Sequence, residues 1–193
     1  MDSGRKDEQV VAGREGLAPW RVVETLAEVR SPWIAVVGER LEESSGRQVD
    51  YWRIEKADSV VAVTILDGSL ILPRPTYRPG VGRTTLDLPG GRLEKGGPVL
   101  DVAAEAVCRE LGLPGPEHIL RATLLSEVGW DVDSSTSDQK LFGVVLELVG
   151  GAPLDPSLVG ASYPANEAGV GALLGDVTCL QCRSVVREWW CRL

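Results

Sequence analysis

Histidine and cysteine are scarce in this 193-residue chain, which limits the metal and nucleophilic chemistry it can carry. The one histidine, His118, lies in a polar connection, so we interpret it as a surface loop residue rather than a catalytic base. Cys179-x2-Cys182 has the spacing of half a zinc site or of a redox pair, but a zinc site has four ligands and a second pair is missing. With Cys108 and Cys191, these are the only cysteines, and we expect free thiols in a reducing cytoplasm.

Positive charge and long apolar runs are also lacking. The formal net charge is −8 and the pI is about 4.8, which argues against nucleic-acid binding, because a phosphate backbone is bound by a basic surface. The sequence contains no run of about 18 apolar residues, and no apolar stretch follows the charges of the N-terminal segment. We therefore expect no membrane association and a cytoplasmic location.

Length and composition favour one domain. A chain of 193 residues with 44% hydrophobic content can form one well-packed core but is short for two. Residues 1–18 are charged and show little periodicity, so we predict a flexible tail followed by a single domain over 19–193.

Alternation of apolar and polar residues predicts strands at 20–29, 33–42, 49–56, 59–65, 69–78, 119–128 and 139–149. Ser31-Pro32 separates the first two strands, and Asp67-Gly68 is a strong hairpin signal. The polar loop 129–138 carries Asp131, Asp133 and Asp138; these carboxylates could hold a cation, but in an acidic chain we interpret the segment as a solvated loop. A helix is predicted at 178–191, and no element is predicted in the Gly-, Pro- and Ala-rich segment 150–171.

The most informative stretch runs from Leu86 to Leu113 and reads as loop, helix, loop. Pro98 suits the first helical position and Gly112 suits a left-handed helix end, which predicts a helix over 98–111. Apolar residues spaced by three and four place one face of this helix on a core. Glu105 and Arg109 are four apart and are expected to form an ion pair. The order of elements gives an α+β fold with a mixed β-sheet between helices.

This stretch, with the approach sequence Tyr77 to Gly91, resembles the Nudix hydrolases, in particular their ADP-ribose pyrophosphatase-like branch. The family box is G-x5-E-x7-R-E-U-x-E-E-x-G-U, where U is a bulky aliphatic residue. Laid down without a gap, its glycines fall on Gly91 and Gly112 and its bulky residues on Val107 and Leu113. The resemblance covers about residues 20–190 and implies a Nudix-type α/β/α sandwich. It also implies a homodimer, because such early strands pair between subunits in that family.

The chemical positions of the box are mostly changed, so the box is degenerate. Its first Glu falls on Gly97, its Arg on Glu105, and its three helix carboxylates on Ala106, Arg109 and Glu110. Only Glu110 keeps a carboxylate on the patch that would hold Mg²⁺. A guanidinium about 4–6 Å from a divalent cation opposes its binding by several kcal/mol at an effective dielectric of about 20.

The resemblance and the residues nominate several site positions. Glu110 and Glu94 are the candidate catalytic residues and metal ligands, and Glu167 is the only glutamate where the family often places a late general base. The candidate ligand-binding residues are Tyr77, Arg78, Arg83, Gly90, Gly91, Arg92, Arg109 and Trp130. Arginine can donate two parallel hydrogen bonds to a diphosphate, backbone N–H groups at the glycines can approach phosphate closely, and Trp130 or Tyr163 can stack on a base.

Three classes of function stay open. The chain is a weakened or inactive relative that keeps a pocket for a nucleoside diphosphate-linked small molecule, an active Mg²⁺-dependent hydrolase of an ADP-sugar that uses carboxylates outside the box, or a structural dimer without a ligand. The family resemblance favours hydrolysis, whereas the residues favour binding. Mg²⁺ is the expected cofactor only if the protein is active.

Overall fold

The computed structural model describes residues 19–193, so the tail expected at 1–18 lies outside the described residues. The chain divides into two compact units, with the boundary after Ile54. The first unit is a three-stranded sheet in the order β1-β2-β3, formed by β1 (Arg21–Arg30), β2 (Ala35–Glu42) and β3 (Gln48–Glu55). The predicted separation of the first two strands at Ser31-Pro32 is confirmed, because a turn joins β1 to β2 in which the Ser31 N–H donates to the Ile34 carbonyl oxygen at 2.9 Å.

Ion pairs and one close aromatic contact hold the first sheet together. Arg40 of β2 bonds Asp50 of β3 at 2.8 Å and Glu24 of β1 at 3.1 Å. The ring of Trp52 lies over Gly38, where an added Cβ would stand 2.8 Å from the indole. β1 is nevertheless exposed along almost its whole length, although it carries several apolar side chains.

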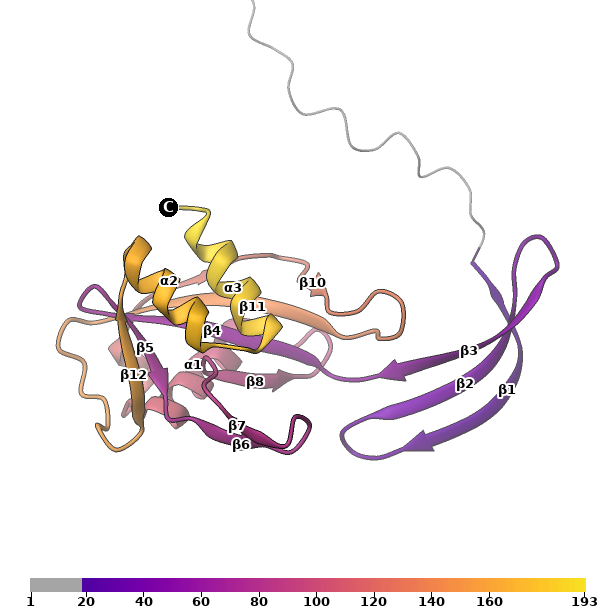
Figure 1. Cartoon of the computed structure of the whole chain (residues 1–193), viewed down its shortest axis with the longest axis horizontal. Helices are drawn as coiled ribbons and strands as arrows, with labels where there is room; N and C mark the ends of the chain where they lie inside the picture. Colours follow the sequence, from indigo (N-terminus) through magenta and orange to yellow (C-terminus); the bar gives the residue numbers. More distant parts are fainter. Residues whose placement is uncertain (1–18) are drawn as a thin grey trace, which may run out of the picture. The chain divides into compact units, whose positions relative to one another are not determined.

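The second unit is built on a mixed sheet (Figure 1). Its strands are β4 (Asp58–Leu66), β5 (Ser69–Pro73), β8 (Gly90–Leu93), β9 (Ile119–Leu124), β10 (Trp130–Asp131), β11 (Lys140–Leu148) and β12 (Val159–Pro164). The main path runs β10-β11-β4-β5-β12, with β8 paired to β4 and β9 to β11. β11 and β4 are parallel and the other pairs are antiparallel. A separate hairpin joins β6 (Thr76–Arg78) to β7 (Arg83–Thr85).

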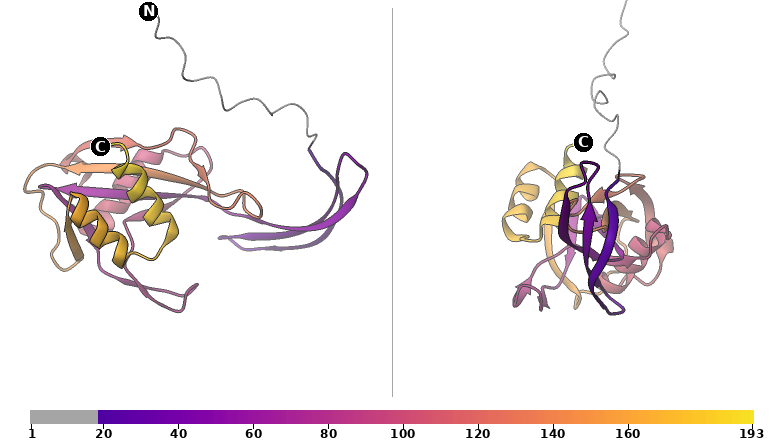
Figure 2. Two further views of the ribbon diagram at one scale, coloured as in Figure 1. Left: turned by 45° about the horizontal axis from the view of Figure 1, so that its top comes forward. Right: turned by 90° about the vertical axis from the view of Figure 1, so that its right-hand side faces the viewer.

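Helices cover both faces of this sheet. α1 (Val99–Leu111) packs on one face, and α2 (Glu167–Asp176) and α3 (Leu180–Trp190) pack on the other, as two views show (Figures 1 and 2). A short 3-10 turn, η1 (Pro116–His118), precedes β9. The two-residue period of β4 explains the two cores, because Val60 and Ala62 face α1 whereas Val61 and Val63 face α2 and α3. The predicted sandwich with a mixed sheet is confirmed.

Several local predictions are confirmed and others are wrong. Asp67 and Gly68 both take positive φ (47° and 73°), as a tight hairpin turn requires. Gly112 ends α1 in the left-handed conformation (φ 68°), but Pro98 lies one residue before the helix, at its N-cap. The predicted strand 69–78 is interrupted before β6. β12 and the first half of α2 fall in the segment 150–171, where no element was expected.

His118 lies at the end of the short turn η1, with its side chain 31% exposed, as a loop position implies. None of the helices formed by residues 19–193 combines the length and the apolar character that a bilayer crossing requires.

Candidate functional site

The two glycines before α1 were expected in a loop, but they lie in a strand that is held close to both the sheet and the helix. Gly90 and Gly91 belong to β8 and pair with Val61 and Val60 of β4. An added Cβ would stand 2.9 Å from the Val60 carbonyl oxygen at Gly90, and 2.9 Å from Cγ1 of Val102 at Gly91. Glycine is therefore needed here for close packing, which explains the position of these residues without reference to a ligand.

The charged residues of α1 pair differently from the sequence prediction. Arg109 does not reach Glu105; its Nη2 donates to Glu110 Oε1 at 2.7 Å and to the Gly90 carbonyl oxygen at 3.1 Å. The predicted pair of Glu105 and Arg109 is wrong because the guanidinium turns towards β8, where a backbone acceptor is available. Arg109 thus links the helix to the turn and occupies one oxygen of the only carboxylate left on this patch.

The residues of the box do not fit Mg²⁺. Ala106 is fully buried and Gly97 has no side chain, while Arg109 brings a positive charge to the patch and is bonded to Glu110. Glu94 is 80% exposed and bonded to Arg92 Nε at 3.1 Å. Among residues 19–193, no group of three carboxylate, thiol or imidazole ligands comes together on α1 or its loop. A hard divalent cation would find one paired carboxylate where it needs several oxygen ligands.

A cavity of about 350 Å³ adjoins this patch. Its charged lining consists of Arg74, Arg78, Arg109, Asp87 and Glu110, a surplus of one positive charge in a chain whose net charge is −8. Arg78 Nε bonds Asp87 Oδ2 at 2.8 Å, so two of the three arginines hold carboxylates in place. Within the described part of the chain, Arg74 forms no ion pair at salt-bridge distance, although its charge helps to lower the pKa of Asp155.

The other nominated residues lie apart from this cavity lining. Tyr77 is 59% exposed on β6, and Arg83 of β7 contacts Thr178 Oγ1 at 3.3 Å. Trp130 lines a different cavity, of about 270 Å³, between β10 and α3. Glu167 is exposed in the first turn of α2, on the face of the sheet opposite α1. The structure thus brings Arg78, Arg109 and Glu110 together.

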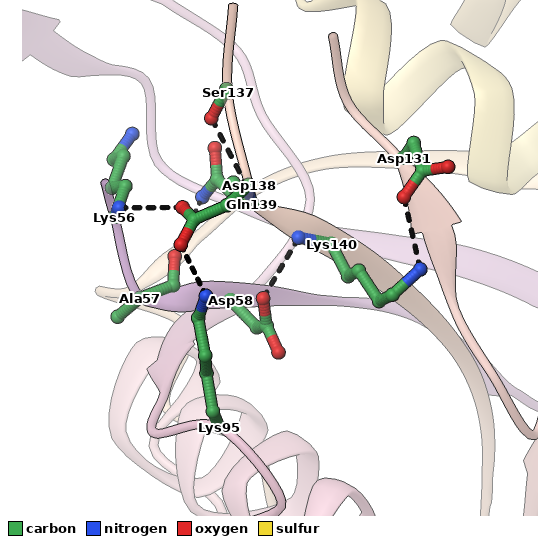
Figure 3. A network of polar contacts seen from close by, with 9 residues as sticks. All are labelled: Lys56, Ala57, Asp58, Lys95, Asp131, Ser137, Asp138, Gln139 and Lys140. Carbon is green, nitrogen blue, oxygen red and sulfur yellow. Dashed lines mark hydrogen bonds and ion pairs between the residues drawn. The ribbon is translucent and has the colours of Figure 1, made fainter. Parts of the chain in front are cut away.

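The aspartates of loop 129–138 are occupied separately by neighbouring groups, as Figure 3 shows for two of them. Asp131 accepts from Lys140 Nζ at 2.9 Å. Asp138 pairs with Lys95 and also accepts from the Lys56 N–H at 2.9 Å. These contacts tie the loop to the edge of the sheet and leave no shared cation position.

Asp133 has a purely local role in the same loop. It accepts from the Ser135 hydroxyl at 2.6 Å and also from the Thr136 hydroxyl. These hydrogen bonds lower the pKa of the Asp133 carboxyl to about 2. The carboxylate stabilises a turn, in agreement with a solvated loop.

The Cys179 and Cys182 thiols meet at the start of α3. Cys179 is the N-cap residue of that helix, and Cys182 is buried at 3% exposure. A hydrogen bond from the Cys182 thiol, helped by the backbone N–H groups of Cys182 and Gln181, lowers the pKa of Cys179 to about 6, although burial opposes this shift. The same hydrogen bond, together with burial, raises the pKa of Cys182. Cys179 is therefore the more acidic thiol of the pair.

Two residues of the site were missed by the sequence prediction. Arg74 directly follows β5 and Asp87 lies in the loop before β8, and both line the cavity. Arg74 stands close to Arg78 in an Arg-Pro-Thr-Tyr-Arg segment, so the clustering of arginines there was an available signal. Nothing in the spacing marked Asp87, whose role depends on contacts across the fold.

Comparison with known proteins identifies the fold but assigns no family. No family model matches the chain, and no curated protein matches it. Among solved structures, one described as the crystal structure of an ADP compounds hydrolase is similar, with a TM-score of 0.67 and 23% identity over 91% of this chain and 96% of that one. The fold is thus a Nudix-type α/β/α sandwich. At this identity, the likeness concerns the fold alone.

Proposed function

We propose that this protein binds a nucleoside diphosphate-linked small molecule in the arginine-lined cavity and hydrolyses it very slowly or not at all. The observation that carries the proposal is Arg109, which stands where the resembling family has a carboxylate and is directed to Glu110 and the Gly90 carbonyl. A site built this way favours an anionic ligand and opposes a divalent cation.

The cavity suits a diphosphate in size and charge. Its volume of about 350 Å³ lies at the lower end of the range of about 300–1,000 Å³ typical of small-molecule sites. The guanidinium groups of Arg74, Arg78 and Arg109 all keep N–H groups that can donate to phosphate oxygens, although Arg78 Nε and Arg109 Nη2 are already bonded within the protein. The solved structure of similar fold is described as acting on ADP compounds, which agrees with this class of ligand.

The alternative of an active Mg²⁺-dependent hydrolase would need Glu94 and Glu110 as ligands. Both are engaged by neighbouring arginines, and Glu94 projects into solvent with 80% of its side chain exposed. Glu167, the candidate general base, stands on the other face of the sheet from Glu110. These positions favour binding over catalysis, and we derive no catalytic step through Mg²⁺.

Calorimetry with ADP-ribose, in EDTA and separately in Mg²⁺, tests the proposal. We expect binding in both conditions, and an affinity loss of about tenfold or more in Arg74→Ala and Arg109→Ala, because a hydrogen bond to a charged group contributes about 1.5–3 kcal/mol. Arg121→Ala is the matched control, since Arg121 is also an exposed arginine paired with a glutamate but lies on β9, outside the cavity.

Two results would contradict the proposal. Binding seen only with Mg²⁺ would show that a metal, rather than Arg109, holds the diphosphate. Turnover of ADP-ribose faster than about 1 s⁻¹ with Mg²⁺ would show an ordinary enzyme rate and an assembled active site.

We also propose that the protein is a homodimer in the cytoplasm. The first unit exposes apolar residues on β1 and around its turn, with Val22, Leu26, Val29 and Trp33 between 37% and 71% exposed. A second copy is the occupant we favour, because the resembling family pairs these strands between subunits. All four cysteines are free thiols, which supports a reducing compartment.

A further inference from the structure

Three potential metal ligands from distant parts of the chain meet behind the arginine-lined cavity. The sulfur atoms of Cys179 and Cys182 and a carboxylate oxygen of Asp87 all lie within 4.8 Å of one another. Residues 19–193 contain no other such group of three. Asp87 comes from the loop before β8 and the two thiols from the start of α3, so the fold, rather than local sequence, creates the cluster.

Asp87 has one oxygen that lacks a partner. Its Oδ2 accepts from Arg78 Nε at 2.8 Å and from Thr85 Oγ1 at 2.9 Å. Its Oδ1 is buried and has no hydrogen-bond partner, although only 12% of the side chain is exposed. A buried carboxylate oxygen without a partner is unfavourable because it has lost its water and gained no donor, and a bound cation would supply the missing partner.

We propose that Asp87, Cys179 and Cys182 form a zinc-type metal site with two thiolates, one carboxylate and one open position. Zn²⁺ takes thiolate and carboxylate ligands in tetrahedral geometry, and three protein ligands with a fourth exchangeable position is a recognised arrangement. Because 4.8 Å is the upper limit of these separations, a contraction of at most about 1 Å brings the donor atoms to the separations set by Zn–S bonds of about 2.3 Å and Zn–O bonds of about 2.0–2.2 Å.

Charge balance supports a divalent ion at this place. Two thiolates and a carboxylate carry three negative charges, so a bound divalent cation leaves a net charge of −1 on the site. The guanidinium of Arg78, which donates to Asp87 Oδ2, neutralises this remaining charge. Arg78 also holds the carboxylate in orientation, as partners of metal ligands commonly do. A disulfide between the two cysteines would instead leave Asp87 Oδ1 buried and unpaired, which is why we favour the metal.

The test is a titration of the full-length, freshly reduced protein with Co²⁺ under anaerobic conditions, without nucleotide. We expect one Co²⁺ per chain, a near-ultraviolet thiolate-to-cobalt absorption band, and displacement of the cobalt by Zn²⁺. In Cys179→Ser and Asp87→Asn the affinity should fall by more than about 100-fold and about tenfold, respectively, because loss of an outer-shell partner alone costs about 10–100-fold. Circular dichroism verifies that each variant is folded.

Cys191→Ser is the matched control, since Cys191 is an exposed thiol at the end of the same helix, and its variant should bind Co²⁺ as the wild type does. A folded wild-type protein that gives no cobalt band would overturn the proposal. So would a band that survives in Cys179→Ser, or unchanged affinity in Asp87→Asn. A pair of thiols that binds no metal after full reduction but readily forms a disulfide would identify a redox pair instead.

Discussion

The substitution Ala106→Glu is the most direct probe of α1, because it places a carboxylate where the box of the resembling family would have one. Ala106 is 0% exposed, so a glutamate there must displace packed neighbours or be buried. Overpacking costs about 1–3 kcal/mol, and burying a carboxyl group without a partner adds about 1–3 kcal/mol. The free energy of unfolding should therefore fall by about 2–6 kcal/mol, a large share of the 5–15 kcal/mol typical of a domain.

Urea unfolding followed by tryptophan fluorescence measures this loss. Burial raises the pKa of the new carboxyl group above its unfolded value of about 4.3, so the unfolded state releases the proton first. The destabilisation should therefore increase as the pH rises above about 4.3 and level off beyond the folded pKa. Measurements at about pH 5.5, above the pI of about 4.8, and at about pH 8 should differ in this direction.

Ala168→Glu provides the control, because Ala168 is exposed in the first turn of α2, where an acidic residue is favourable. That variant should lie within about 0.5 kcal/mol of the wild type. Equal stability of the two variants would refute the reasoning. It would mean that position 106 opens to solvent and that the helix can accept a carboxylate there at little cost.

Two further predictions concern packing and assembly. Gly91→Ala should destabilise the protein by about 1–3 kcal/mol, because its Cβ would contact Val102. Gly171→Ala in α2 contacts nothing within 4 Å and should stabilise the protein by about 0.5–1 kcal/mol. Urea unfolding of both variants tests whether the space around the new methyl group determines the sign of the change in unfolding free energy. The wild type should have the mass of a dimer by light scattering at micromolar concentration, and Val29→Asp should reduce it to a monomer while Leu120→Asp, an equally exposed site on β9, should not. A monomeric wild type would contradict the proposed dimer.

The long strands β4 and β11 could be predicted well because burial of both faces produces continuous apolar runs, whereas the short strands β8, β10 and β12 were not predicted. Both strands contribute to the two cores, and the Asp67-Gly68 turn indicated the hairpin that joins β4 to β5. α2 was missed because it is short and carries three glycines among its ten residues, which hides its buried face. Its N-cap signal was present, since the Asn166 side chain accepts from the Gly169 N–H at 3.0 Å.

The cysteine pair was seen in the sequence, but its meaning depends on a residue far along the chain. Spacing alone suggested half a metal site, and the missing partner led to an interpretation as free thiols. The fold supplies Asp87, whose loop is held against α3 by the packing of Leu88 in the same core as Cys182. A ligand that tertiary packing brings to the site cannot be recognised from sequence spacing, whereas ligands that share one helix can be recognised in this way.

Arg109 has both a structural and a proposed binding role, and the two must be separated. Residues one apart on a helix do not face each other, so its contact with Glu110 depends on the long side chain turning towards Gly90 rather than on helix spacing. Removing the guanidinium therefore releases Glu110 from its ion pair and also removes a hydrogen-bond donor to the phosphate groups of the ligand. A lysine at position 109 keeps the charge but not the planar fork. If Arg109→Lys retains stability yet weakens ADP-ribose binding, the fork geometry acts on the ligand; if both change together, the contact to β8 is the main role.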